Sequence, residues 1–344
     1  MTPAAARLSP APPGAGDPRP RAAALALAAL LATAAMLAGC GGGDTSTGSA
    51  RAVALALDFT PNPVHAPIYA AVREHEDRAN GIRLQIRPPG EGPDSLKLVV
   101  SGRATVGVLD IHDLAIARER GVDVVGVGAL VQRPLAALLA QPEIHRPREL
   151  EGRRVGVSGL PSDPAFLDAI VGSDGGDAKR VKQVTIGFQA VSALASRRVA
   201  AVPAFWNAEG VALDQKGHRV RQFRVERYGA PPYPEVVFFT ARRTLDTRRD
   251  DVAATMRAVA AGVRDVERDP SAAVQQMTRL SQGADARLVR AQLDAVRPLF
   301  DPPLTLDRAV LERWARFDAR IGLVEHRPDV ARAFDFSVAR PTPR

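Results

Sequence analysis

The sequence predicts an α/β protein built as two lobes. From residue 52 onward, short apolar runs of strand length alternate with helical patterns, and a second unit of this kind starts near residue 151. Such alternation is typical of a mostly parallel sheet with helices on both faces. Two units followed by a helical last third indicate a bilobed protein, in which ligands bind between the lobes at the C-terminal ends of the strands.

The first unit is marked by continuous apolar runs with turn signals between them. Residues 53–57 (VALAL) are predicted to form a buried strand, and the Asn80–Gly81 turn precedes the next strand. The expected strands cover residues 53–57, 82–86, 104–109 and 122–131, and the expected helices cover residues 65–79 and 94–102.

The second unit starts at Glu151–Gly152. The segment RRVGVSG is predicted to be a strand followed by a glycine loop, and a helix is expected from about Asp163. Further strand candidates cover residues 181–186, 199–203, 219–225 and 236–240.

The last third carries two amphipathic helical patterns. In the first, apolar residues recur at steps of three and four from Val252 to Val266, and Asp269–Pro270 ends the helix. The second runs from Leu306 to Ile321, with Thr305 as its expected N-cap. Met256 and Trp314 lie on these apolar faces and are expected to be ordinary core residues.

The N-terminus has the pattern of a secretory signal. Arg19 and Arg21 stand just before residues 22–38, an almost entirely apolar run. The run ends in Leu-Ala-Gly-Cys, which resembles the bacterial lipobox, where the cysteine is acylated and becomes the first mature residue. We expect residues 1–39 to be a signal peptide and Cys40 to carry lipid. The alternative is an uncleaved anchor helix.

Residues 40–51 are rich in Gly, Ser and Thr and are expected to be a flexible tether. Together with the lipobox, this tether predicts attachment to the cell membrane by lipid, on its extracytoplasmic face. We expect the protein to be a monomer. Cys40 is the sole cysteine of the sequence, which excludes an internal disulfide and a thiolate metal cluster. No metal site and no cofactor are expected.

The formal net charge of +8 raises the question of a nucleic-acid partner. The arginines, however, are interleaved with Asp and Glu, and aromatic residues make up 5% of the chain, too few for an obvious base-stacking surface. We interpret the charge as a solvated surface, drawn to anionic lipid near the anchor, and expect no nucleic-acid binding.

Four segments that follow predicted strands carry polar or aromatic side chains suited to holding a ligand. They cover residues 58–69, 109–113, 158–163 and 204–210, and prolines stiffen the first of them. The candidate contacts are Phe59, Asn62, His65, Tyr69, Asp110, Gly159, Ser162, Trp206, Asn207 and Glu209. Each also has a structural interpretation: Asn62 as a turn cap, Trp206 as core, and His65 as a hydrogen-bonding structural histidine.

The first of these segments resembles a family signature. LDFTPNPVHAPIYAA is similar to the pattern Asp-Trp-Thr-Pro-Asn, then His, then an aromatic, found in the NMT1/ThiY-like group of pyrimidine-precursor-binding proteins and fungal hydroxymethylpyrimidine synthases. The matching positions are Asp58, Thr60, Pro61, Asn62, His65 and Tyr69, with Phe59 in place of Trp. Similar segments continue in order over about residues 52–325, including RPLAALLA, LEGRRVGVSG, GFQAVSALASRRVAAVPAFWNAEGVAL and YGAPPYPEVVFFT.

The resemblance implies a type II periplasmic-binding fold, with two mixed sheets flanked by helices and a hinge between the lobes. We expect residues 52–135 with 240–344 to form one lobe and residues 136–239 the other. It also implies the solute-binding component of an ABC importer, with permease and ATPase subunits as partners and a thiamine pyrimidine precursor as ligand.

By the same resemblance, Glu209 would accept paired hydrogen bonds from the polar edge of an aminopyrimidine-like ring. Asn62 and His65 would reach substituents at the rim. The expected stacking partners of the ring are Phe59, Trp206 and Tyr233.

Other functions stay open from the sequence. Phe59 in place of Trp, and Val64 where the family often has a polar residue, allow a related ligand such as a riboflavin-type ring. Sulfonate, taurine and nitrate binders share the architecture. An enzyme related to the synthases would need their cysteine-rich CCCFC segment, which is absent. The cluster of Asp110, His112 and Asp113 allows hydrolysis, although no GxSxG or HExxH motif accompanies it.

Overall fold

The computed structural model describes residues 50–90, 94–281 and 285–338. The expected signal peptide, the expected lipidation site Cys40 and almost all of the expected tether lie outside these residues. In the part of the chain that is described, no helix has both the length and the apolar character needed to cross a membrane.

The first sheet has five strands and is mixed. Its strands are β1 (Arg51–Ala56), β2 (Ile82–Arg87), β3 (Val106–Asp110), β4 (Val124–Val131) and β10 (Val236–Ala241). Their order is β2-β1-β3-β10-β4, in which β1 is parallel to β2 and β3, and β10 is antiparallel to both of its neighbours. All residues of β3, β4 and β10 are buried. The near-continuous apolar sequences of β3 and β10 fit their inner place in the sheet, whereas β4 lies at its edge, where isolated bridges join it to Leu304 and Phe334.

The second sheet is also five-stranded and mixed. Its strands are β5 (Ala136–Ala140), β6 (Arg154–Val157), β7 (Lys182–Thr185), β8 (Ala201–Phe205) and β9 (Arg221–Arg224). They are ordered β7-β6-β8-β5-β9, with β6 parallel to β7 and β8, and β5 antiparallel to β8 and β9. The expectation of two mixed sheets flanked by helices is confirmed.

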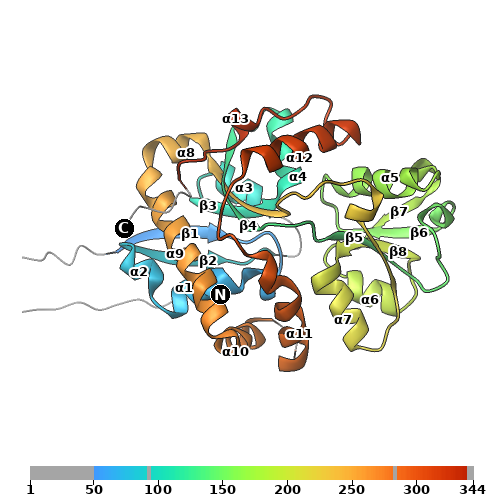
Figure 1. Cartoon of the computed structure of the whole chain (residues 1–344), viewed down its shortest axis with the longest axis horizontal. Coiled ribbons are helices and arrows are strands. Elements are labelled where there is room, and N and C mark those ends of the chain that lie inside the picture. The colour runs from blue at the N-terminus through green and yellow to red at the C-terminus, as the bar shows by residue number, and fades with distance from the viewer. Residues whose placement is uncertain (1–49, 91–93, 282–284, 339–344) are drawn as a thin grey trace, which may run out of the picture. The chain divides into compact units, whose positions relative to one another are not determined.

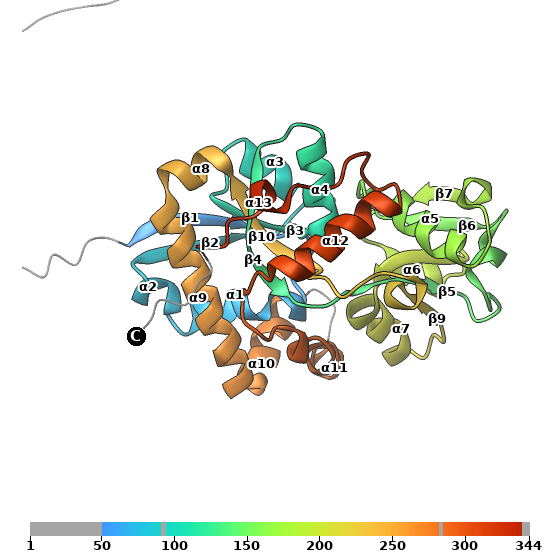
Figure 2. The ribbon, with the colours of Figure 1, turned by 45° about the horizontal axis from the view of Figure 1, so that its top comes forward.

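The chain passes between the sheets twice, through residues 132–135 and residues 225–235. Figures 1 and 2 both show these two connections running close together. A buried side chain joins them: the Glu235 carboxylate accepts hydrogen bonds from the backbone N–H groups of Leu135 and Ala136.

Helices cover both sheets. With the first sheet lie α1 (Ala66–Arg73), α2 (Glu76–Ala79), α3 (Ser95–Val100), α4 (Ile111–Glu119), α8 (Arg242–Thr247), α9 (Arg249–Arg268), α10 (Pro270–Leu280), α11 (Ala286–Val296), α12 (Arg308–Arg320) and α13 (Val330–Ala333). With the second lie α5 (Asp163–Ser173), α6 (Ala190–Ala195) and α7 (Val211–Gln215) (Figure 1).

Two expected helix boundaries differ from the structure. The helix expected over residues 65–79 is split, because His75 adopts a left-handed conformation with φ of 60° between α1 and α2. The cap of α12 is Asp307 rather than Thr305, since the Asp307 carboxylate accepts from the N–H groups of Ala309 at 2.8 Å and Val310 at 3.0 Å.

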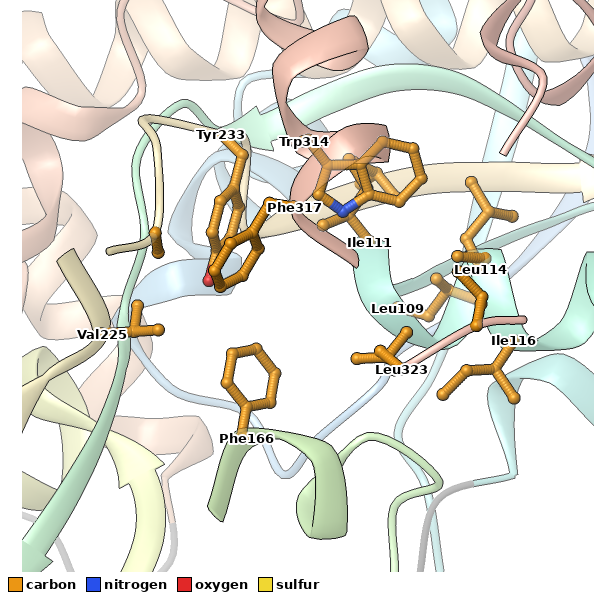
Figure 3. Packing of buried hydrophobic residues seen from close by; sticks show 14 of the residues in the cluster. Leu109, Ile111, Leu114, Ile116, Phe166, Val225, Tyr233, Trp314, Phe317 and Leu323 are labelled. Atoms are coloured by element: carbon orange, nitrogen blue, oxygen red, sulfur yellow. The ribbon is translucent and has the colours of Figure 1, made fainter. Parts of the chain in front are cut away.

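An apolar cluster continues from α4 and α12 into α5. Figure 3 shows Trp314 and Phe317 of α12, Tyr233 of the second connection and Phe166 of α5 in this cluster. Trp314 is fully buried, as expected, and so is Met256 in a separate cluster around α9.

The contact between α1 and α9 depends on Gly262. A Cβ at this position would lie 2.1 Å from the backbone oxygen of Pro67. We predict that Gly262→Ala lowers the free energy of unfolding by about 1–3 kcal/mol, because the two helices must move apart. Chemical denaturation measures this. Gly172→Ala is the control: it lies in helix α5 with nothing within 4 Å of the added carbon, so it should be neutral or stabilising by up to about 1 kcal/mol. Equal effects of the two variants would contradict the packing argument.

Candidate functional site

A cavity of about 460 Å³ lies between the strand ends of the two sheets. Its wall includes the loops that follow β1, β3, β6, β7 and β8, together with residues of β5. This volume is within the range of small-molecule sites, and C-terminal strand ends are where open α/β sheets bind ligands.

The structure brings most of the residues expected from the sequence to this cavity. Those that line it are Phe59, Asn62, His65, Asp110, Gly159, Ser162 and Glu209. Those expected but not among its lining residues are Tyr69, Trp206, Asn207 and Tyr233.

The loop after β1 is organised around His65, whose side chain is buried. Its Nδ1 accepts a hydrogen bond from the N–H of Asn62 at 3.3 Å, so Nε2 carries the proton and donates to the Asp58 carboxylate at 2.8 Å. The Asn62 side chain in turn accepts from the N–H of Val64 at 2.9 Å. Both ring nitrogens of His65 are therefore used within the loop, and the histidine fixes the shape of the cavity wall.

The glycine loop after β6 is closed by Asp163. One oxygen of its carboxylate accepts from the Ser158 hydroxyl at 2.9 Å and from the N–H groups of Gly159 at 2.9 Å and Leu160 at 3.2 Å. Gly159 has φ of +94°, a backbone conformation that residues with a Cβ rarely adopt. Ser162, at the end of the same loop, donates its N–H to Asp113 of α4 at 3.2 Å, which links this loop to the first sheet.

Glu209 lies in a π-helical turn, η4 (Trp206–Gly210), that directly follows β8. One carboxylate oxygen accepts from the N–H of Phe205 at 3.1 Å. Burial raises the pKa of the Glu209 carboxyl. A π-helical turn is a frequent feature of functional sites, and here it turns the carboxylate back to the cavity wall.

The aromatic residues that do not line the cavity have other partners. The Trp206 ring lies under the guanidinium of Arg224, 3.9 Å from its centroid, and its Nε1 donates to the Pro134 carbonyl at 3.2 Å. Tyr233 is fully buried, with its ring edge-to-face with His112 at 4.6 Å. Tyr69 is buried in the apolar cluster around α9.

Phe188 is a cavity residue that the sequence did not single out. It follows β7 and lines the cavity, and its ring centroid is 4.1 Å from that of Phe59. The two phenyl rings come from loops of different sheets and are tilted by 52°. The placement of Phe188 just after a predicted strand was the signal that could have found it.

The cavity wall is acidic. The described lining residues include one arginine, Arg120, and five residues with carboxyl side chains: Asp58, Asp110, Asp113, Asp163 and Glu209. Burial raises the pKa of Asp113 to about 7, and burial together with the neighbouring Glu235 holds the pKa of Asp110 well above its usual range. An anionic ligand would meet a wall of acceptors, whereas a ligand rich in N–H donors would find partners.

The family model described as NMT1/THI5 like matches residues 62–273, more than half of the chain. This chain belongs to the NMT1/THI5-like family. The resemblance noted in the sequence is therefore confirmed, and the match extends from the loop after β1 to α10.

Relatives of known name include both binding proteins and enzymes. The formylaminopyrimidine-binding protein of Halalkalibacterium halodurans is 28% identical over 237 residues, covering 68% of this chain and 72% of that protein. The 4-amino-5-hydroxymethyl-2-methylpyrimidine phosphate synthase of Uromyces fabae is 23% identical over 252 residues, covering 69% of this chain and 73% of the enzyme.

The fold is also that of solved binding proteins. The alkanesulfonate-binding protein SsuA from Xanthomonas axonopodis pv. citri, bound to MOPS, matches with a TM-score of 0.68 at 18% identity, over 83% of this chain and 98% of that chain. At this identity the likeness concerns the fold and not the ligand.

The hydrogen bonds that Asp163 accepts within the glycine loop after β6 lead to a prediction about stability. Asp163→Ala leaves three donors of the glycine loop without their acceptor, so we expect the free energy of unfolding to fall by about 1–3 kcal/mol. Thermal and chemical unfolding measure the loss. Asp168→Ala, an exposed acid on the same helix, should change it by less than about 0.5 kcal/mol. If both variants were equally stable, Asp163 would not be holding the loop.

Proposed function

We propose that this protein is the extracytoplasmic solute-binding component of an ABC importer and captures a small heteroaromatic nutrient in the cavity between its two sheets. The nutrient is a thiamine precursor of the hydroxymethylpyrimidine or formylaminopyrimidine type. In the same proposal, residues 52–135 with 240–344 and residues 136–239 act as two lobes, and the mature monomer is held at the membrane by lipid on Cys40. Its partners are permease and ATPase subunits.

The observation that carries this proposal is the composition of the cavity. Phe59 and Phe188 place apolar rings at the wall, and Glu209 places a carboxylate there. A carboxylate accepts two parallel hydrogen bonds, the pattern that an amino group beside a ring N–H donates. An aromatic ring stacked on a phenyl ring gains about 0.5–1.5 kcal/mol beyond its burial. The relative that binds formylaminopyrimidine supports the same ligand class.

The acidic wall argues against the sulfonate, taurine or nitrate alternative. Those ligands carry full negative charge and need cationic or N–H donors around them. Burial raises the pKa of Asp110 and Asp113, which means that negative charge is disfavoured in this wall, and an anionic ligand would bring more of it.

The synthase relatives make catalysis the second candidate, and we propose binding instead. The sole cysteine of the chain is Cys40, so the cysteine-rich segment of the fungal synthases has no counterpart. Both ring nitrogens of His65 are held by Asn62 and Asp58, which suits a structural histidine better than a reactant.

Calorimetric titration of the purified full chain with four ligands tests the proposal. We expect hydroxymethylpyrimidine or formylaminopyrimidine to bind with one site per chain, and taurine to give no heat of binding. Riboflavin is the intermediate case, because its larger ring system needs more room than a single pyrimidine. Tight taurine binding with no response to any aromatic ring would overturn the ligand class, and turnover of a bound pyrimidine would overturn the role of binder.

The raised pKa of the Glu209 carboxyl leads us to predict that ligand binding depends on pH. Its ionised form is the acceptor, and its raised pKa means that protonation begins at a higher pH than for an exposed glutamate. The affinity for an aminopyrimidine should therefore fall as the pH is lowered, by up to about tenfold per pH unit below the pKa of the free protein. Titrations from pH 8 to pH 5 measure the slope.

Glu209→Gln is the matched variant for this experiment. It keeps the size of the side chain but has no proton to gain, so its affinity should be weaker at pH 8 and should lack the part of the pH dependence that comes from Glu209. Titration of another wall carboxyl such as Asp113 appears in both proteins. Any titration of the ligand itself appears in both proteins and is subtracted. If wild-type and Glu209→Gln proteins bound the ring equally at every pH, Glu209 would have no role in recognition.

A further inference from the structure

Next to the cavity lies a buried group of three metal-ligand side chains that the sequence did not predict as a metal site. Asp110 is the last residue of β3, His112 is in the first turn of α4, and Glu235 ends the second connection. The side chains are buried, with residue exposures of 9%, 0% and 0%. One ring nitrogen of His112 and one carboxylate oxygen from each of the other two all lie within 4.8 Å of one another.

Each of the three side chains is fixed from one side by the surrounding structure. Asp110 accepts from the N–H of His112 at 2.8 Å, and Glu235 Oε2 accepts from the backbone of Leu135 and Ala136. His112 Nδ1 is 2.7 Å from the fully buried carboxylate of Asp318. These bonds hold the three side chains close together before any ion binds.

Two of the remaining atoms of this group have no partner. Within the described part of the chain, His112 Nε2 and Glu235 Oε1 are buried and make no hydrogen bond. The Nδ1 atom lies 2.7 Å from the Asp318 carboxylate and 3.3 Å from Trp314 Nε1. We assign the proton to Nδ1, because the contact with the carboxylate is the shorter one, and in that neutral tautomer Nε2 presents a lone pair. A lone pair and carboxylate oxygens grouped in a dry interior are costly unless a cation lies between them.

A proton is one such cation, but it satisfies only part of the group. Asp110 and Glu235 each have a carboxylate oxygen within 4.8 Å of the other, so one proton held by this pair relieves the repulsion between the two charges. That proton leaves His112 Nε2 without a partner. A metal ion bound by all three side chains satisfies the two carboxylates and the imidazole together.

The donor set selects the kind of metal. One imidazole nitrogen and two carboxylate oxygens suit zinc, whereas Ca²⁺ and Mg²⁺ prefer six or more oxygen ligands. The Asp318–His112 bond is the carboxylate–histidine pairing that orients histidine ligands of zinc. Phe166 and Tyr233 pack edge-to-face on the His112 ring, each at a centroid distance of 4.6 Å, and enclose it in an apolar shell.

We propose that Asp110, His112 and Glu235 bind one zinc ion, with Asp318 positioning the histidine. Zinc–ligand bonds of about 2.0–2.2 Å place tetrahedral ligand atoms roughly 3.4 Å apart, so the side chains need to close in by roughly 1 Å. Three protein ligands leave a fourth position for water, and Asp110 lies in the cavity wall through which that water would enter.

The test is a zinc titration of the chelator-treated full chain, with no organic ligand present, so its outcome is independent of the proposed transport function. We expect one zinc ion per chain by calorimetry and elemental analysis. X-ray absorption at the zinc edge should show nitrogen and oxygen ligands at about 2.0–2.2 Å, including one imidazole.

Glu235→Gln is the decisive variant. Its amide oxygen can still accept from Leu135 and Ala136, and its NH₂ can donate to Asp110, so the fold is retained while a ligand is lost. We expect zinc binding weakened more than about 100-fold, with cooperative unfolding preserved. Glu226→Gln removes the same charge from an exposed position of the same connection and should bind zinc like the wild type.

Asp110→Asn is the second variant, should Glu235→Gln fail to fold. Asparagine keeps the cap on α4 because its oxygen also accepts from the N–H of His112, but it is a poor zinc ligand. No zinc uptake by the wild type would overturn the proposal and leave a proton shared by the two carboxyl groups. Zinc uptake unchanged in both variants would also overturn it, because the ion would then lie elsewhere.

Discussion

The structure around the cavity depends on the pairing of buried carboxylates with backbone N–H groups. An ionised carboxylate cannot be buried without partners, and a loop backbone cannot be buried without acceptors. In this protein the buried carboxylates accept hydrogen bonds from the buried backbone N–H groups, so both are satisfied. Asp163 closes the glycine loop, Asp110 caps α4, and Glu235 joins the two connections between the sheets. Because these bonds fix backbone and side chain together, the cavity wall is organised by the fold itself.

The same pairing explains why the wall can be acidic and still well formed. Four of the five wall carboxyl groups accept from a backbone N–H group, as Glu209 does from Phe205, and the fifth, Asp58, is bonded to the His65 side chain. Burial raises the pKa of Asp163 and Glu209. Donors on a ligand then meet acceptors that are already in place, so little conformational entropy is lost on binding. The arrangement favours ligands with N–H groups over anions without requiring a positively charged residue.

Local patterns in the sequence predicted most strands and the two amphipathic helices, because apolar periodicity reports directly on burial. Pairing between distant segments was not predictable in this way. Residues 236–240 were expected as a strand, yet nothing local indicates that this strand, β10, returns to the first sheet between β3 and β4. Asp307 and Thr305 are both good caps two residues apart, and only the hydrogen bonds of the folded helix distinguish them.

The candidate site was predictable where a residue follows a strand directly, since strand ends meet at one cavity. Phe59 and Glu209 satisfy that rule, and Phe188 satisfies it too. Tyr233 precedes its strand and packs on His112 instead. Position after a strand is not sufficient, however, because Trp206 and Asn207 also follow β8 directly and do not line the cavity. Because a sulfonate binder has the same fold, the ligand class depends on these few wall residues, and substitutions there can change the ligand while the two sheets stay as they are.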